Sequence, residues 1–222
     1  MEEFARDYFD LLNGEYGGIN LTRITDWDEF WKKQILDSIE PLNQSEVFRD
    51  SLVRAGLHID VGFGGGFPLL PLAYLLPDVV FIGIEARAKK AKVVNEMANK
   101  LGLLNVHCTH ARLENLVIDK PCTVSFKAVG KVNDFLSKII TQQKIQAFFY
   151  KGPNFYNIES NQIEQTKRSW NITEEIEIHI QDTQNRYIIG FENIHVPHGT
   201  PPKNNIMKLS QIINVKKKDS HG

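Results

Sequence analysis

Two kinds of hydrophobic spacing divide this chain. Up to about residue 55 the apolar residues recur every three to four positions, first over 4–12 and again over 27–35. That period is typical of amphipathic helices. The glycine-containing turn 14–18 separates the two runs. The spacing therefore predicts a helical N-terminal cap, to which we assign residues 1–55.

Beyond the cap, short runs rich in β-branched residues alternate with helical patterns. Gly102 closes one of the helices as a natural stop. Strands alternating with helices imply a parallel sheet with helices on both faces. The predicted strands are 57–61, 79–84, 106–109, 123–126 and 147–150, and the predicted helices follow the first strand through residue 76 and then span 86–101 and 132–140.

The last third of the chain breaks this rhythm. Isoleucines at 176, 178 and 180 alternate with polar residues, and a short polar turn leads to a second apolar run at 187–191. Two strands joined by so short a turn must be antiparallel, because a parallel pair needs a crossover of a dozen or more residues. A mostly parallel sheet of this kind, closed by an antiparallel hairpin, is typical of a class I methyltransferase rather than a dehydrogenase. We assign 56–193 to this α/β core and 194–222 to a loose tail with a short helix at 207–213.

Composition narrows the possible classes of protein. The 222 residues carry 26 Lys and Arg against 27 Asp and Glu, so bulk positive charge cannot hold a nucleic acid. Basic residues do cluster at 87–92 and 216–218, where a solvated surface is the simplest interpretation. The longest apolar run, 67–76, is too short to span a membrane. An acidic N-terminus and only two cysteines favour a cytoplasmic protein without disulfides or a metal centre.

A glycine loop follows the first predicted strand and opens a helix. It reads Asp60-Val-Gly62-Phe-Gly64-Gly-Gly-Phe67-Pro. Glycines at such a place allow positive φ angles and let a ligand touch the backbone. A dinucleotide fingerprint requires glycine where Phe67 stands. The acidic Asp60, two positions before the first glycine, suits the ammonium group of S-adenosylmethionine and would repel a pyrophosphate.

A second acidic residue supports a nucleoside ligand. Glu85 closes the second strand, 23 residues after Gly62. A carboxylate there can accept hydrogen bonds from both hydroxyls of a ribose. This fits NAD and S-adenosylmethionine equally. Together with the loop it predicts a nucleoside cofactor.

The segment DVGFGGGFPLLPLA resembles the GidB/RsmG family of bacterial 16S ribosomal RNA guanine-N7 methyltransferases. Asp37-Ser38 and Tyr150-Lys151-Gly152 resemble other parts of the family pattern, and the likeness spans roughly residues 8–191. It implies a seven-stranded methyltransferase sheet with a helical N-terminal extension, S-adenosylmethionine as cofactor and 16S ribosomal RNA or the small ribosomal subunit as partner. A monomer would suffice.

The glycine loop, the strand ends and the resemblance together give a set of predicted site residues. The predicted cofactor contacts are Asp60, Gly62, Gly64, Phe67, Glu85, Leu113, Glu114 and Lys127. The residues assigned to catalysis or RNA are Arg112, Lys127 and Lys151, all at predicted carboxyl ends of strands. The family usually has Ser-Arg-Ala where this chain has Phe126-Lys127-Ala128, so the charge is kept but the planar bidentate fork is lost.

Guanine N7 has a free lone pair, so its methylation needs no general base, and the sequence offers no obvious one. Three alternatives stay open at this point. The first is an S-adenosylmethionine-dependent methyltransferase of another substrate. The second is a catalytically silent RNA-binding relative, and the third is an NAD-linked oxidoreductase that uses the same loop and Glu85.

Overall fold

One seven-stranded sheet organises the fold. In a computed structural model of the chain, described for residues 1–202 and 206–219, the strand order is β3-β2-β1-β5-β7-β9-β8. Strands β3, β2, β1, β5 and β7 pair in parallel, each with the next in this order. Strand β9 is antiparallel to both of its neighbours, β7 and β8. The predicted class I methyltransferase architecture is confirmed. The strands are β1 Leu57–Val61, β2 Val80–Glu85, β3 Val106–His110, β5 Thr123–Lys127, β7 Gln146–Lys151, β8 Trp170–Ile178 and β9 Arg186–Asn193.

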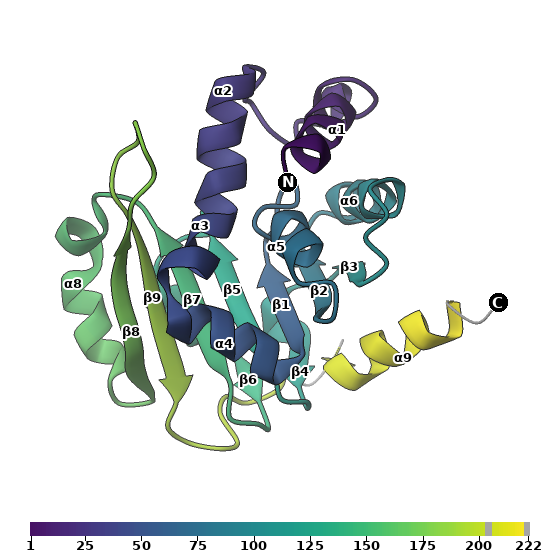
Figure 1. The fold of residues 1–222 in the computed structure, drawn as a ribbon. Helices are drawn as coiled ribbons and strands as arrows, with labels where there is room; N and C mark the ends of the chain where they lie inside the picture. Colours follow the sequence, from purple (N-terminus) through teal and green to yellow (C-terminus); the bar gives the residue numbers. More distant parts are fainter. Residues whose placement is uncertain (203–205, 220–222) are drawn as a thin grey trace.

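Helices cover both faces of this sheet (Figure 1). Side chains of α1 to α6 share one buried core with the sheet, and those of α7 to α9 share the other. The helices are α1 Glu2–Asn13, α2 Trp27–Phe30, α3 Asp37–Gln44, α4 Glu46–Ala55, α5 Leu69–Leu75, α6 Ala88–Lys100, α7 Val132–Leu136, α8 Phe155–Thr166 and α9 Leu209–Asp219. Two 3-10 turns, η1 Gly17–Ile19 and η3 Leu113–Asn115, and a π-helical turn, η2 Trp31–Leu36, complete the set.

The alternation of side chains along β1 places a polar network inside the core that α1 to α6 share with the sheet. Because successive side chains of a strand point to opposite faces, Leu57, Ile59 and Val61 enter one core while His58 and Asp60 enter the other. The ring nitrogens of His58 lie 2.7 Å from the Thr123 hydroxyl and 2.8 Å from that of Ser125, and Ser125 donates to Asp60 at 2.8 Å. Burial lowers the pKa of His58 to about 3 and raises the pKa of Asp60 to about 7.

Several elements differ from the sequence-based expectation. Helix α8 was not predicted, and α3 and α4 lie within the predicted helical cap but were not located individually. The helix expected over 132–140 ends at Leu136. The following residues form β6, which pairs with β4, and β10 pairs with the other edge of β4. These three strands are β4 Leu116–Ile118, β6 Ile140–Thr141 and β10 Met207–Lys208. Strands of two or three residues are too short to show a hydrophobic period, so the pattern could not reveal them.

Within the region assigned to the C-terminal tail, residues 207–214 are packed against the rest of the fold. They form β10 and the start of α9, whose Leu209 and Ile212 are buried. The helix expected over 207–213 is observed as α9 from Leu209 to Asp219, because Met207 and Lys208 form β10 instead. The basic side chains at 216–218 lie outside the residues whose side chains the structure describes.

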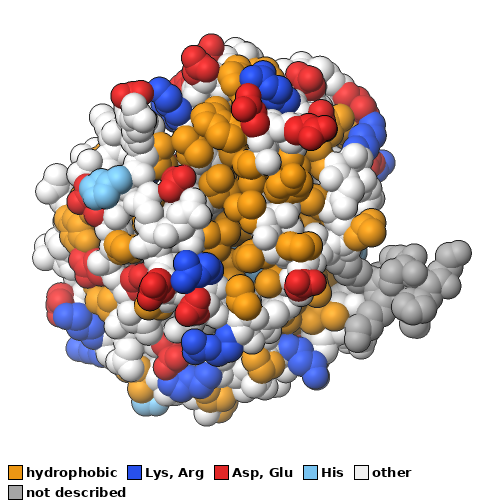
Figure 2. Space-filling model, in the orientation of Figure 1, with side chains coloured by type: hydrophobic (Ala, Val, Ile, Leu, Met, Phe, Trp, Pro, Cys, Tyr) orange, Lys and Arg blue, Asp and Glu red, His pale blue; other side chains and the backbone are white. Residues whose placement is uncertain are grey.

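In the view of Figure 2, apolar side chains gather around α5, and charged side chains lie over α4. Val47 and Val53 on α4 and Tyr74 and Leu75 on α5 are the larger apolar side chains left partly exposed on these helices. These four side chains offer no positive charge to a polyanion. Within the described part of the chain, no helix is long and apolar enough to cross a bilayer.

Candidate active site

The carboxyl ends of β1, β2, β3 and β5 surround a cavity of about 430 Å³, which we call the first cavity. Small-molecule sites commonly measure about 300–1,000 Å³, and in open α/β sheets they lie at this edge. Six of the residues predicted from the sequence line it, although they come from the ends of three different strands and the residues that follow them. These are Gly62, Gly64, Glu85, Arg112, Leu113 and Glu114.

The loop after β1 needs glycine for two physical reasons. Gly62 and Gly64 have φ angles of 71° and 57°, in the region that L side chains avoid. A Cβ atom added to Gly62 would also lie 2.6 Å from Cγ1 of Val129, across the cavity wall. The loop is thus a cradle in which the ligand can approach bare backbone.

Glu85 links this loop to the end of β2. One carboxylate oxygen accepts a hydrogen bond from the Gly64 amide at 3.2 Å, and the other accepts one from the Arg87 amide at 3.0 Å. Each oxygen keeps a further lone pair, so the carboxylate can still receive the two hydroxyls of a ribose. The residues present therefore fit a nucleoside.

Asp60 and Phe67 lie behind the loop and are not among the residues lining the first cavity. Asp60 is fully buried, and its second carboxylate oxygen accepts from the Leu69 amide at 3.1 Å, at the start of α5. Phe67 stacks on Tyr8 with ring centroids 5.0 Å apart, and the Tyr8 hydroxyl donates to the carbonyl of Gly65. In this structure both residues hold the loop in place. Their direct contact with a cofactor stays a prediction.

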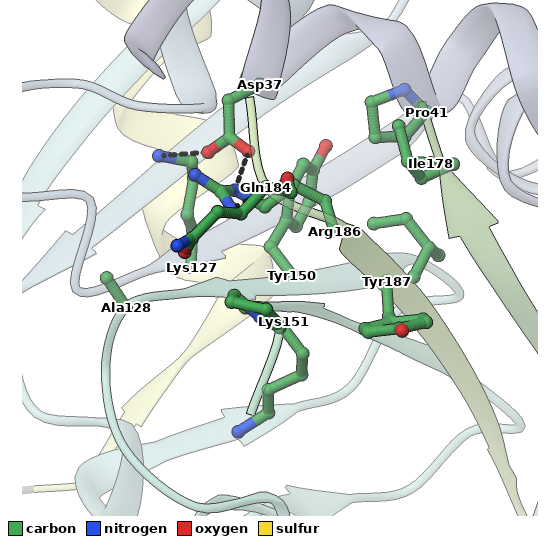
Figure 3. A pocket seen from close by; sticks show the side chains of 13 residues that line it. Asp37, Pro41, Lys127, Ala128, Tyr150, Lys151, Ile178, Gln184, Arg186 and Tyr187 are labelled. Atoms are coloured by element: carbon green, nitrogen blue, oxygen red, sulfur yellow. Dashed lines mark hydrogen bonds and ion pairs between the residues drawn. The ribbon is translucent and has the colours of Figure 1, made fainter. Parts of the chain in front are cut away.

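A second cavity, of about 320 Å³, adjoins the first and shares Ala128 with it. It is formed by the start of α3, the ends of β5 and β7, and the β8–β9 hairpin (Figure 3). Its walls combine aromatic rings with charged groups. The lining residues are Asp37, Pro41, Lys127, Ala128, Tyr150, Lys151, Gly152, Pro153, Ile178, Gln184, Arg186, Tyr187 and Ile188.

Asp37 joins two cations at one end of this second cavity. Its carboxylate oxygens lie 2.9 Å from Nζ of Lys127 and 2.9 Å from Nε of Arg186 (Figure 3). The cluster keeps one net positive charge. Asp37 directly follows the π-helical turn η2, and such turns frequently occur at functional sites. Lys127 thus faces the second cavity and is not among the residues lining the first.

Lys151 is turned away from that cluster (Figure 3). Its ammonium is buried and donates to Glu159 at 2.8 Å and to the Gly130 carbonyl at 2.6 Å. Burial lowers the pKa of Lys151, and the hydrogen bond with Glu159 opposes that shift. The other oxygen of Glu159 accepts from the Val132 amide at 2.7 Å. Lys151 and Glu159 therefore hold the segment 128–132, which separates the two cavities.

The cations that line the first cavity are not engaged in ion pairs within the described part of the chain. Arg87, Lys90, Arg112 and Lys138 make no ion pair with any described residue, although Nζ of Lys138 lies 5.1 Å from the ring centre of Phe135. Because Glu85 and Glu114 are the two carboxylates in the same lining, positive charge is in excess at the walls of this cavity.

Sequence reasoning missed two features of the site. Asp37 was noted as part of a motif but not as a site residue, and Arg186, the first residue of β9, gave no signal because it follows directly on a polar turn. Their meeting depends on a contact between residues 149 positions apart. No local pattern in a single sequence contains that information.

The strand order, the glycine loop after β1 and the acidic residue ending β2 define a class I, Rossmann-like methyltransferase fold. Comparison with known proteins gives the family: the chain belongs to GidB, described as rRNA small subunit methyltransferase G, which matches residues 1–189. The resemblance found in the sequence is thereby confirmed.

Individual relatives carry the same description. The ribosomal RNA small subunit methyltransferase G of Streptococcus thermophilus (strain CNRZ 1066) is 36% identical over 128 residues, which are 58% of this chain and 52% of the relative. That of Lactobacillus johnsonii is 36% identical over 159 residues, 68% of this chain and 65% of the relative. The chain thus spans between half and two thirds of the length of these relatives. A crystal structure of a SAM dependent methyltransferase from Aquifex aeolicus aligns with 76% of this chain and 97% of its own, at 18% identity and a TM-score of 0.49.

Proposed function

We propose that this protein transfers a methyl group from S-adenosylmethionine to N7 of a guanine in 16S ribosomal RNA. The observation that carries the proposal is the pair of cavities that meet at Ala128. One has the glycine cradle and carboxylate suited to a nucleoside cofactor, and the other has aromatic and cationic walls suited to a base. Family membership and the names of the relatives support the same assignment.

In the first cavity, Glu85 would receive the ribose hydroxyls, and Gly62 and Gly64 would let the amino acid part approach the backbone. Leu113 and Glu114 would contact the adenine at the opposite wall. When bound there, the cofactor supplies a methyl group on a positively charged sulfur.

In the second cavity, Tyr187 and Tyr150 offer ring faces for a purine, and the Asp37 cluster offers donors for guanine O6 or a phosphate oxygen. The N7 lone pair forms the new bond to carbon while the carbon–sulfur electrons return to sulfur. No proton has to leave N7, so the chain's task is to hold the acceptor about 3–3.5 Å from the methyl carbon and in line with the sulfur. Lys127 would act there through its charge.

The RNA would cross the mouth of the first cavity. Unpaired cations such as Arg112 and Lys90 would contact its phosphates, which explains how a chain of near-neutral net charge binds a polyanion. A ribosomal substrate also places the protein in the cytoplasm. A single copy of the chain supplies every group named here, so a monomer suffices.

The test is incorporation of label from S-adenosylmethionine into 16S ribosomal RNA or into small-subunit particles. We expect label in one guanine, and none when that guanine is replaced by 7-deazaguanine, which lacks the accepting nitrogen. S-adenosylhomocysteine binding measured by calorimetry would show separately that the cofactor cavity is intact. Cofactor binding without label in either form of RNA would overturn the proposed reaction.

A silent RNA-binding relative is the second candidate, and one observation favours it. Lys127 replaces the arginine usual in the family, and its ammonium is engaged by Asp37. The variant Lys127→Arg separates the two candidates, because it restores the guanidinium fork at this point of the second cavity. RNA binding without turnover in both wild type and variant would favour the silent relative.

A further inference from the structure

The residues that follow the family match form a strut against β4. The match with GidB ends at residue 189, and residues 206–214, which we call the tail segment, lie beyond it. In β10, Met207 lies opposite Leu116 and Lys208 opposite Val117, in parallel pairing. β4 is thereby enclosed between β10 and β6.

Helix α9 adds side-chain contacts to this pairing. Leu209 is completely buried, and it belongs with Ile212 to the same core as Leu113 and Leu116. Asp119, just after β4, accepts hydrogen bonds from the Ser210 amide at 2.9 Å and from its hydroxyl at 2.6 Å. The tail segment thus holds both ends of β4.

The held strand continues directly from the wall of the first cavity. β4 begins at Leu116, immediately after η3, and η3 supplies Leu113 and Glu114 to that cavity. On its other side, the preceding segment lines a cavity of about 350 Å³ together with Met207 of the tail segment. Residues 111–115 therefore lie between the nucleoside cavity and the tail segment.

We propose that the tail segment fixes residues 111–115 in the conformation that binds the cofactor, with Leu209 and Ser210 as positioning residues. The proposal rests on the cofactor assignment made under the proposed function. A binding segment that is ordered beforehand loses less conformational entropy when the ligand arrives, so its affinity is higher. Leu209 and Ser210 are absent from the lining of the first cavity and act only through β4 and η3.

The experiment compares two leucines of equal burial. Leu209→Ala removes side-chain packing of the tail segment, while Leu52→Ala removes an equally buried leucine on α4, in the other core. Both variants should melt at lower temperature. Only Leu209→Ala should weaken S-adenosylhomocysteine binding, by about fivefold in Kd, and speed amide hydrogen exchange over 111–118. Ser210→Ala, which removes only the hydroxyl bonded to Asp119, should give a smaller effect in the same direction.

Equal Kd values for the Leu209→Ala and Leu52→Ala proteins, with unchanged exchange over 111–118, would overturn the proposal. If Leu209→Ala does not fold, Ser210→Ala against wild type decides by the same two readouts. If wild type binds no S-adenosylhomocysteine, the cofactor assignment fails instead. In that case, amide hydrogen exchange over 111–118 in the Leu209→Ala protein tests only whether the tail segment fixes residues 111–115. Faster exchange than in wild type supports this role, and unchanged exchange rejects it.

Discussion

At the scale of single residues, the buried groups His58 and Asp60, just before the active-site loop, make the stability of the fold depend on pH. Burial favours the neutral form of both groups, with a pKa of about 3 for His58 and about 7 for Asp60. For Asp60 the pKa is raised, so its contribution to stability is complete at low pH and is lost as pH rises through about 7. For His58 the pKa is lowered, so its contribution is complete above the ordinary histidine value and is lost as pH falls toward about 3. In the pH range between these pKa values, stability falls with rising pH because of Asp60 and rises with pH because of His58.

Asp60→Asn should remove the contribution of Asp60 to the change of stability with pH. The amide keeps the neutral shape and can bond to Ser125 and to the Leu69 amide. Relative to wild type, its free energy of unfolding should therefore rise with pH between about 4 and 7, on the order of 1 kcal/mol per pH unit. Urea unfolding at several pH values measures this difference. Asp50→Asn, an exposed control, should show no such trend, and a flat difference for Asp60→Asn would mean that Asp60 is ionised in the fold.

The glycine cradle allows a matched test at two positions. Gly62 and Gly56 have φ angles of 71° and 62°, so alanine costs each about 1–2 kcal/mol of backbone strain. Only at Gly62 does the added Cβ meet another group, because the surroundings of Gly56 are open within 4 Å. Gly62→Ala should weaken S-adenosylhomocysteine binding at least about tenfold, and Gly56→Ala should leave it unchanged. Equal affinities in calorimetry would show that this loop is not the cofactor site.

At the scale of elements, buried and exposed ion pairs should behave differently. Lys151 and Glu159 connect β7 to α8 with side chains 9% and 8% exposed, whereas Lys144 and Glu192 are 54% and 37% exposed. Removing one partner of a buried pair leaves the other charge without compensation.

Glu159→Gln should therefore lower the free energy of unfolding by about 3–5 kcal/mol. Glu192→Gln should cost no more than about 1 kcal/mol, because solvent already screens that pair. Chemical denaturation measures both. Because Glu159 and Lys151 also bond to residues 130 and 132, the first variant should loosen the wall between the cavities, visible as faster amide exchange there. A small cost for both variants would show that Lys151 is not committed to this structural role.

The same elements show what a single sequence reveals. The long strands β1, β2 and β7 were predicted nearly to the residue, because hydrophobic alternation and flanking turns are local properties. The first cavity was equally accessible, since its residues follow consecutive strands whose ends must meet at one sheet edge. The second cavity was not, because Asp37 and Arg186 meet only through the docking of the helical cap on the β8–β9 hairpin.

At the scale of the whole molecule, the cations differ in whether they form ion pairs. Many of the lysines, such as Lys144 and Lys167, are paired with neighbouring carboxylates. Around the first cavity the cations have no such partners among the described residues, and exposed Lys89 and Lys131 adjoin that region in sequence. A chain with a net charge of −1 can in this way present a local positive field.

That difference predicts which lysines set the salt dependence of RNA binding. Each phosphate that a variant no longer neutralises reduces the slope of log affinity against log salt by about 0.7–0.9, because fewer counterions are released. The double variant Lys89→Ala/Lys131→Ala should therefore bind 16S ribosomal RNA more weakly and with a shallower slope. It should keep its affinity for S-adenosylhomocysteine, since neither side chain lines the first cavity. Lys144→Ala/Lys167→Ala removes the same charge from paired positions and should leave the slope unchanged. Equal slopes for the two double variants would mean that RNA approaches over another face.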